Sequence, residues 1–468
     1  MDIIDLLVIQ GGMGINVSND KLAKLCSRFG ILGTVTCTGA ERMLAHKLEA
    51  GDLDGQCRHA LAHFPYPEVA ERILEKYYIF GGKLEEDEFK KVPIWSFTSR
   101  RDLIELAVAG SFVHVWLAKE GHDGPISVNY LEKLQWHIYH LVGAMLAGVD
   151  YVTMGAGITL QIPAVLDAIA YGGVPTYRVD VAGSTTGTKQ ISFDPREFFG
   201  SFPRELKRPG FLPIVSTDAL ANIMVTKLPK GSIQGFVIET PDAGGHNALP
   251  RKKGEYDAKG QPVYGPRDEV NFDKLGSLGI PFWIGGAYAS PEGLARAQKL
   301  GAVGIQAGSI FALCEDSGLD PYYRSEIRRL GYRGELEVIS DPTASPTGFP
   351  FQVVQLPGTH SDPEVYAARE RNCSIGALQF YAQLENGKVV PRCPAEPIDD
   401  YLRKGGKIED TVGARCLCNM LFAAVNLAYY KERPGFTLGR DTSFLRRLMT
   451  HENDSYGAWQ AIQWLLSR

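Results

Sequence analysis

The chain has 468 residues, of which 44% are hydrophobic and 22% charged, and its net charge is −5. This composition is typical of a globular protein that buries a large core, and one α/β barrel alone can take up about 250 residues. The acidic balance and the lack of a basic run with interleaved aromatics argue against nucleic-acid binding, and no apolar run approaches the ~20 residues of a membrane span. The eight cysteines are sparse, which indicates a reducing, cytoplasmic location.

The first 36 residues predict a strand, a helix and a second strand. Apolar runs over residues 5–10 and 31–36 are the expected strands. Between them, apolar residues recur at helical spacing over residues 22–29, and Ser18 is the expected N-cap. This order predicts two parallel strands joined by a crossover helix.

The same alternation continues along the middle of the chain. The helix over residues 291–300 has the clearest ends, with Ser290 as its N-cap and Gly301 after its last turn. Further strands are expected at residues 126–130, 152–154, 212–216, 236–239, 282–284 and 303–306. With the first two they make eight, so we expect an α/β protein with a (β/α)8 TIM barrel. An additional candidate strand at residues 176–181 leaves a doubly wound open sheet as the alternative.

Three regions interrupt this alternation. Residues 40–124 are expected to form a helical insertion in the barrel, including a helix over residues 99–119. Residues 182–210 are rich in Gly, Ser, Thr and Pro and predict a long loop. Beyond residue 330 the alternation stops, and a mostly apolar helix is expected over residues 411–431. We therefore expect a barrel over residues 1–330 and a mainly helical C-terminal subdomain over residues 331–468.

The most informative string, residues 239–246, reads Glu-Thr-Pro-Asp-Ala-Gly-Gly-His and directly follows an expected strand. It would therefore lie at the C-terminal mouth of a barrel, where active sites of this fold are found. Gly244 and Gly245 permit close backbone approach to a ligand, and His246 can act as a base or an acid near neutral pH. The alternative is a glycine turn followed by an ordinary surface histidine.

Glycines end three other strands. Gly285 and Gly286 follow one strand and Gly308 and Ser309 the next, where barrels commonly bind a phosphate with backbone N–H groups. Taken alone, either pair is more often a simple end of a strand than a phosphate site. Two such pairs after consecutive strands favour a cofactor that carries a phosphate. The first strand ends in a string whose bare backbone could lie against a flavin ring, and its candidate residues are Gly12, Met13 and Gly14.

Polar side chains end the third and fifth strands. Asn129 offers an amide donor and acceptor to the edge of a flavin. Ser216 is a further candidate for cofactor binding, although Ser216 or Thr217 could equally cap the following helix. His137 and His140 fall on an expected helix, and we expect them in a packed face rather than as metal ligands.

Four cysteines fall in the C-terminal region: Cys373, Cys393, Cys416 and Cys418. Zinc or an iron–sulfur cluster requires four thiolates that converge. The spacing lacks a C-x2-C pair, and only the last two are close in sequence. Buried or incidental thiols are therefore the preferred interpretation and no metal ligand is predicted, while a metal site remains the open alternative.

Five of these strings occur in the order and strand context of the nitronate monooxygenase (2-nitropropane dioxygenase) family, which the sequence resembles over roughly residues 5–325. The strings are residues 11–14, 127–129, 243–246, 284–286 and 306–309, and Ala-Gly-Gly-His is the most specific. The resemblance implies FMN without a metal, with His246 in the position of the family's catalytic histidine. The expected function is an FMN-dependent oxidoreductase that oxidises alkyl nitronates with O2.

The insertion and the C-terminal region exceed the compact members of that family. In size they look more like the trans-acting enoyl reductases of polyunsaturated fatty acid and polyketide assembly lines, which share the Gly-Gly-His element. This alternative implies NAD(P)H as electron donor and an acyl-carrier protein as partner, bound through residues 40–124 or the C-terminal region. A homodimer is a further expectation. A third interpretation, which the glycine clusters alone permit, is a barrel that binds a phosphorylated ligand without redox chemistry.

Overall fold

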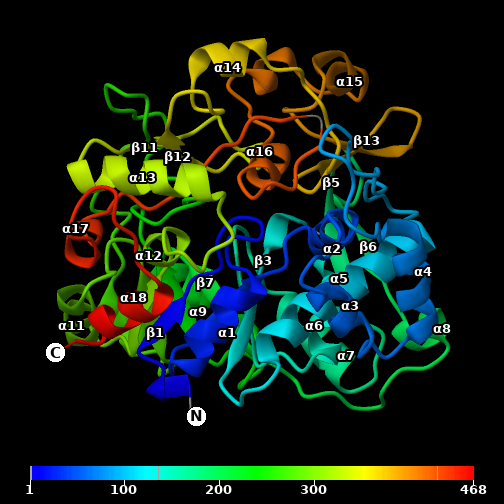
Figure 1. Ribbon diagram of the computed structural model, residues 1–468, viewed down its shortest axis with the longest axis horizontal. Helices are drawn as coiled ribbons and strands as arrows, with labels where there is room; N and C mark the ends of the chain where they lie inside the picture. The colour runs from blue at the N-terminus through cyan, green and yellow to red at the C-terminus, as the bar shows by residue number, and fades with distance from the viewer. Residues whose placement is uncertain (1–2, 135, 430, 468) are drawn as a thin grey trace.

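The computed structural model describes residues 3–134, 136–429 and 431–467, and its centre is a barrel of parallel strands (Figure 1). The strands pair in the order β1-β10-β9-β8-β7-β4-β3-β2. Their bounds are Val8–Gln10 (β1), Gly33–Thr36 (β2), Ile126–Leu131 (β3), Tyr151–Gly155 (β4), Gly210–Val215 (β7), Phe236–Glu239 (β8), Phe282–Gly285 (β9) and Gly304–Ala307 (β10). All eight were expected from the sequence.

The two ends of this sheet meet and close the barrel. Ile9 forms a parallel bridge with Leu32, which directly precedes β2. The N–H of Gln10 donates to the carbonyl of Leu32 at 2.9 Å, and the N–H of Leu32 donates to Val8 at 3.1 Å. This closure confirms the (β/α)8 barrel and excludes the open sheet.

Crossover helices follow the strands as the periodicity predicts. They are α1 (Asp20–Arg28), α6 (His137–Leu146), α7 (Ile162–Ala170), α9 (Asp218–Lys227), α10 (Phe272–Gly276), α11 (Pro291–Lys299), α12 (Ser309–Ala312) and α13 (Pro321–Arg333). The predicted cap of α11 is confirmed, because the Ser290 side chain accepts from the N–H of Gly293 at 2.8 Å. The predicted cap of α1 is wrong by one residue: Asn19, not Ser18, accepts from Leu22, at 2.8 Å.

The insertion between β2 and β3 is helical, as expected. It contains α2 (Ala40–Glu49), α3 (Gln56–Leu61), α4 (Pro67–Tyr77) and α5 (Arg101–Lys119). The buried Glu41 carboxylate of α2 contacts His140 Nε2 at 2.8 Å and pairs with Arg42. His137 is also buried and lies edge-on to Tyr177. Both histidines therefore belong to a packed face, as predicted.

The additional candidate strand belongs to a second, smaller sheet. It is β5 (Thr176–Ala182), and the sheet order is β14-β13-β5-β6. Its other strands are β6 (Thr188–Ser192), β13 (Phe380–Gln383) and β14 (Val389–Arg392). The loop predicted over residues 182–210 is therefore a partial error, because β6 and the short helix α8 (Pro195–Phe199) lie in it. β6 is mostly polar and exposed, so it gave no apolar signal.

The C-terminal region contains helices, as expected, together with strands and irregular segments. The strands β11 (Glu337–Asp341) and β12 (Phe351–Gln355) form an antiparallel pair. The helical elements are α14 (Pro363–Ala368), α15 (Ile398–Arg403), the 3-10 helix η3 (Ile408–Thr411), α16 (Leu417–Ala423), α17 (Leu445–Leu448) and α18 (Ala458–Leu465). The helix expected over residues 411–431 is limited to α16, and Asn426 just beyond it is left-handed at φ 60°. The domain division near residue 331 stays a prediction.

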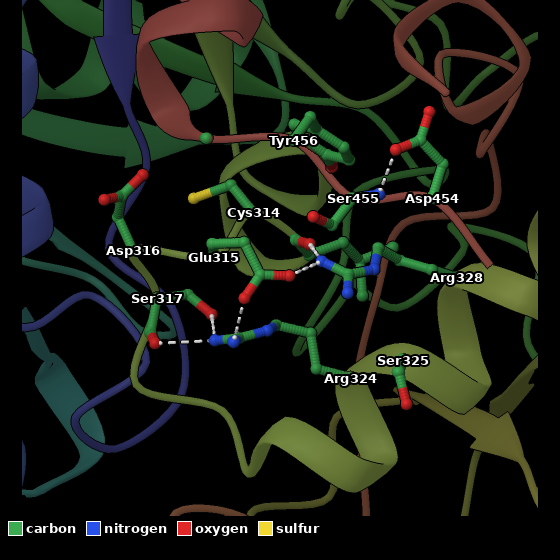
Figure 2. A network of polar contacts seen from close by, with 12 residues as sticks. Cys314, Glu315, Asp316, Ser317, Arg324, Ser325, Arg328, Asp454, Ser455 and Tyr456 are labelled. Carbon is green, nitrogen blue, oxygen red and sulfur yellow. Dashed lines mark hydrogen bonds and ion pairs between the residues drawn. The ribbon is translucent and has the colours of Figure 1, made fainter. Parts of the chain in front are cut away.

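The last helix returns to the barrel and packs against α1, α11 and α12 (Figure 1). An ionic network lies beside this contact (Figure 2). Glu315 pairs with Arg324 at 2.8 Å and with Arg328, and both arginines belong to α13. The N–H of Glu315 donates to the carbonyl of Tyr456 at 2.9 Å, so the network joins the barrel to the segment before α18. Among the described helices, none has the length and apolar character that crossing a bilayer requires.

Candidate functional site

A cavity of about 220 Å³ lies at the carboxyl ends of the barrel strands. We call it the main cavity. It is lined by all but one of the predicted site residues: Gly12, Met13, Gly14, Asn129, Gly244, Gly245, His246, Gly285, Gly286, Gly308 and Ser309. These residues lie at or just after the ends of five different strands, and barrel closure brings them together. Their roles in binding stay predictions.

Ser216 is the predicted site residue that is not part of this lining. It follows β7, next to the N-terminus of α9. The adjacent Thr217 caps α9, since its side-chain oxygen accepts from the N–H of Leu220 at 3.1 Å. For Ser216 and Thr217 the structure therefore favours helix capping over ligand binding, and Thr217 is the residue that caps α9.

His246 is held by the C-terminal region. Its Nε2 lies 2.6 Å from the Ser345 hydroxyl, and its ring lies edge-on to Phe351 at a centroid distance of 4.9 Å. Burial lowers the pKa of His246 from 6.5 to about 4, because the charged imidazolium loses its hydration. The side chain is therefore neutral at pH 7, and it can accept a proton or donate one hydrogen bond.

Glu239 is a second ionisable group in the main cavity, and it was not predicted as a site residue. It ends β8, and no hydrogen-bond partner for its carboxyl is found among the described residues. Burial raises the pKa of Glu239 from 4.5 to about 8. The carboxyl is therefore mostly protonated at pH 7, and it can donate a hydrogen bond to a ligand.

The C-terminal region closes over this cavity. Thr437 Oγ1 accepts from the N–H of Gly245 at 2.8 Å, and the N–H of Gly439 donates to Ser309 Oγ at 2.8 Å. A Cβ on Gly244 would lie 2.8 Å from the backbone of Leu438 and Gly439, so only glycine permits this approach. The Gly-Gly string therefore serves the packing of this segment as well as the cavity.

Backbone N–H groups at the ends of β9 and β10 are available to a ligand. Those of Gly286, Ala287 and Gly308 have no hydrogen-bond partner in the described part of the chain, and all three residues line the main cavity. Gly286 and Ala287 both have positive φ, of 97° and 56°, so the backbone turns sharply after β9. A Cβ on Gly286 would lie 2.2 Å from Thr240 Oγ1, so this turn requires glycine. Such N–H groups fit the phosphate of a nucleotide cofactor.

Comparisons with known proteins leave the family unassigned. No protein-family model matches the chain, and no curated protein matches it in sequence. Among solved structures, FabK from Thermotoga maritima is similar at 16% identity and a TM-score of 0.47, covering 99% of this chain and 92% of that chain. Nitroalkane oxidase from Streptomyces ansochromogenes is similar at 12% identity and a TM-score of 0.46, with coverage of 98% and 94%.

A third solved structure is the enoyl reductase domain of MlnA from the macrolactin biosynthesis cluster of Bacillus amyloliquefaciens. It is similar at 12% identity and a TM-score of 0.37, covering 78% of this chain and 68% of that chain. At these values the likenesses carry no argument about function. The barrel assignment rests on the strand pairing described above.

Proposed function

We propose that the protein is an FMN-dependent oxidoreductase that oxidises alkyl nitronates with O2. The observation that carries this proposal is the convergence of the predicted glycines and His246 around one cavity at the barrel mouth. A cavity with backbone donors for a phosphate, bare backbone for a flat ring and one neutral histidine fits a flavin and a small substrate.

The lining residues form two groups, one suited to the phosphate of FMN and one suited to its ring. The N–H groups of Gly286, Ala287 and Gly308 would bind the phosphate. The backbone after β1 and the side chain of Asn129 would face the ring, and Asn129 Nδ2 is itself held by Thr153 Oγ1 at 3.2 Å. When bound, FMN would supply a two-electron acceptor that also reacts with O2.

His246 would position the substrate. A pKa of about 4 makes its imidazole a weak base for a neutral nitroalkane at pH 7, so we propose that the substrate enters as the nitronate anion. The anion would raise the pKa of His246 through charge attraction and strengthen the hydrogen bond between them. Ser345 would fix the orientation of the ring, since its hydroxyl contacts Nε2.

Replacement of the histidine tests this assignment. We expect His246→Asn to lower kcat/KM for alkyl nitronates by about 10²–10⁴-fold, the usual contribution of a positioned proton-transfer or hydrogen-bonding group. The FMN content of the variant should equal that of the parent, because the phosphate donors lie on other strands. Unchanged nitronate turnover would show that His246 has no role in the reaction.

An enoyl-thioester reductase is the alternative, and one observation favours it. The part of the main cavity formed by the C-terminal region is strongly apolar and would suit an acyl chain. Its apolar residues are Leu378, Leu417, Leu421, Phe436, Leu438 and Phe444. In this version NAD(P)H is the electron donor and an acyl-carrier protein delivers the substrate. NADPH-dependent reduction of a crotonyl thioester under anaerobic conditions would select the alternative, and its absence would reject it.

A further inference from the structure

The four cysteines of the C-terminal region converge although they are far apart in sequence. Cys373, Cys393, Cys416 and Cys418 all line one small void, which we call the cysteine void. Cys373 precedes β13, Cys393 follows β14, and the other two lie at the start of α16. None of the four forms a disulfide. The sequence spacing gave no sign of this convergence, because three separate segments supply the thiols.

The thiols are close enough to influence one another. Burial, and after it the charge of the neighbouring Cys418, raise the pKa of Cys373 to about 12. Burial also raises the pKa of Cys393, and Cys373 is the next cause. The pKa of Cys416 is raised by burial and then by each of the other three. Four thiolates placed together in a buried site repel one another unless a cation binds between them.

A polar side chain lies beside one of these sulfurs. Gln379 Nε2 donates to Cys373 Sγ at 3.6 Å. Hydrogen bonds of this kind stabilise thiolates and tune the potentials of iron–sulfur clusters. A donor beside Cys373 therefore fits a thiolate that binds a ligand.

The size of the site restricts what it can bind. The cysteine void measures about 10 Å³, against about 220 Å³ for the main cavity, so an organic ligand is excluded. Thiolates approach a metal at bonding distance, and an inorganic group therefore needs little free space. Among the described residues, no group of three or more His, Cys, Asp or Glu side chains is placed to hold a single metal ion.

This last observation separates zinc from an iron–sulfur cluster. With Zn–S bonds of about 2.3 Å, four sulfurs around one zinc ion must lie about 3.8 Å from one another. In a four-iron cluster each thiolate binds a different iron, so the four sulfurs lie farther apart around the same void. The four cysteines share the lining of one void, and no single-ion group is found among the described residues, so a cluster fits these observations better than one zinc ion.

We propose that Cys373, Cys393, Cys416 and Cys418 bind a [4Fe–4S] cluster. Leu378, Leu417 and Cys418 line both the cysteine void and the main cavity, so the cluster adjoins the proposed FMN site. The proposal rests on the four thiols and their surroundings, and it holds whether or not the main cavity binds a flavin.

Metal analysis of the intact chain, purified without oxygen, tests the proposal. We expect about four iron atoms and four acid-labile sulfides per chain, and an electron paramagnetic resonance signal after reduction with dithionite. Cys393→Ser and Cys416→Ser should each lose most of the iron. Cys57→Ser is the matched control, because Cys57 is a buried thiol on α3 outside the site, and it should keep the full iron content.

The composition of the unaltered protein decides the matter even if a serine variant fails to fold. One zinc per chain without sulfide, a disulfide within the set, or no iron after anaerobic reconstitution with ferrous iron and sulfide would each overturn the proposal. FMN released from the same samples separates the two proposals. Iron without FMN supports the proposed cluster and contradicts the proposed FMN site. FMN without iron supports the FMN site and contradicts the cluster.

Discussion

At the residue scale, burial leaves two ionisable side chains of the main cavity uncharged at pH 7, Glu239 at the end of β8 and His246 in the loop after it. The pKa of Glu239 is raised to about 8 and that of His246 is lowered to about 4, so at pH 7 the first is protonated and the second is uncharged. An anionic ligand therefore meets no carboxylate at Glu239 and finds hydrogen-bond donors instead. Both effects follow from the same cause, the loss of hydration for the charged form.

Glu239 should make the protein less stable as the pH rises. Unfolded glutamate ionises near pH 4.5, whereas the folded chain keeps this proton to about pH 8. Between these values the folded state binds more protons, so its stability falls with increasing pH. We expect Glu239→Gln to exceed the parent in unfolding free energy by about 1–3 kcal/mol at pH 8, and by much less at pH 5. Urea unfolding at both values measures this, with the exposed Glu85→Gln as control.

The sequence predicted the glycines and His246 that follow barrel strands, but it missed Glu239 at the end of β8 and the lining residues of the C-terminal region. Strand ends are local features, so the Ala-Gly-Gly-His string and Asn129 could be placed at the barrel mouth. The Ser345 partner of His246 is 99 residues away, and the Thr437 partner of Gly245 is 192 residues away. No local pattern marks such pairs. Ser18 shows the same limit, since its hydroxyl donates to Gly11 at 2.9 Å rather than capping α1.

At the scale of elements, the barrel strands were predictable because they are short, buried apolar runs bounded by glycine or polar residues. The second sheet was not, because β13 pairs with β5 from a distant part of the chain. Among the described strands β6 pairs with β5 alone. It is mostly exposed, so apolar and polar residues alternate only weakly along it. The short C-terminal helices likewise depend on tertiary packing more than on their own sequence, and α18, for example, packs against α1, α11 and α12.

The network around Glu315 gives a prediction at this scale. The side chains of Arg324 and Arg328 are only 6% and 7% exposed, and Glu315 is the acidic partner of both. Although burial opposes it, hydrogen bonding from Arg328 and the charges of both arginines lower the pKa of Glu315. Glu315→Gln leaves two buried cations without a counter-charge, so we expect a loss of about 1–3 kcal/mol in unfolding free energy.

Urea unfolding at pH 7 checks this expectation. The matched control is Glu326→Gln on α13, which removes an ion pair with the more exposed Arg329 and should change stability by less than about 1 kcal/mol. Equal effects of the two substitutions would mean that the Glu315 network does not anchor α13.

At the scale of the whole molecule, buried histidines make the fold sensitive to acid. Burial lowers the pKa of His46 to about 3, of His114 to about 4 and of His137 to about 3. The unfolded side chains take up protons near pH 6.5, so stability is lost as the pH falls from 6.5 toward 4. At pH 5 each such histidine lowers the unfolding free energy by about 2 kcal/mol.

Replacement of one of them tests this account. Both ring nitrogens of His137 lack a hydrogen-bond partner among the described residues, so His137→Leu removes the titration without breaking a hydrogen bond. We expect the difference in unfolding free energy between pH 7 and pH 5 to shrink by about 2 kcal/mol in this variant. The exposed His63→Gln should keep the full difference. An unchanged difference in the leucine variant would contradict the account.

We propose that the main cavity binds FMN, and the amount of FMN released from the denatured protein measures this binding. The protein is incubated with FMN, freed of excess by gel filtration and denatured. We predict about one FMN per chain. Gly308→Ala should retain it, since the new Cβ meets only the Met13 side chain at 3.6 Å, whereas Gly308→Asp should lose it by repelling the phosphate. A parent protein that retains no FMN, or an aspartate variant that binds it as well as the parent, would contradict the claim.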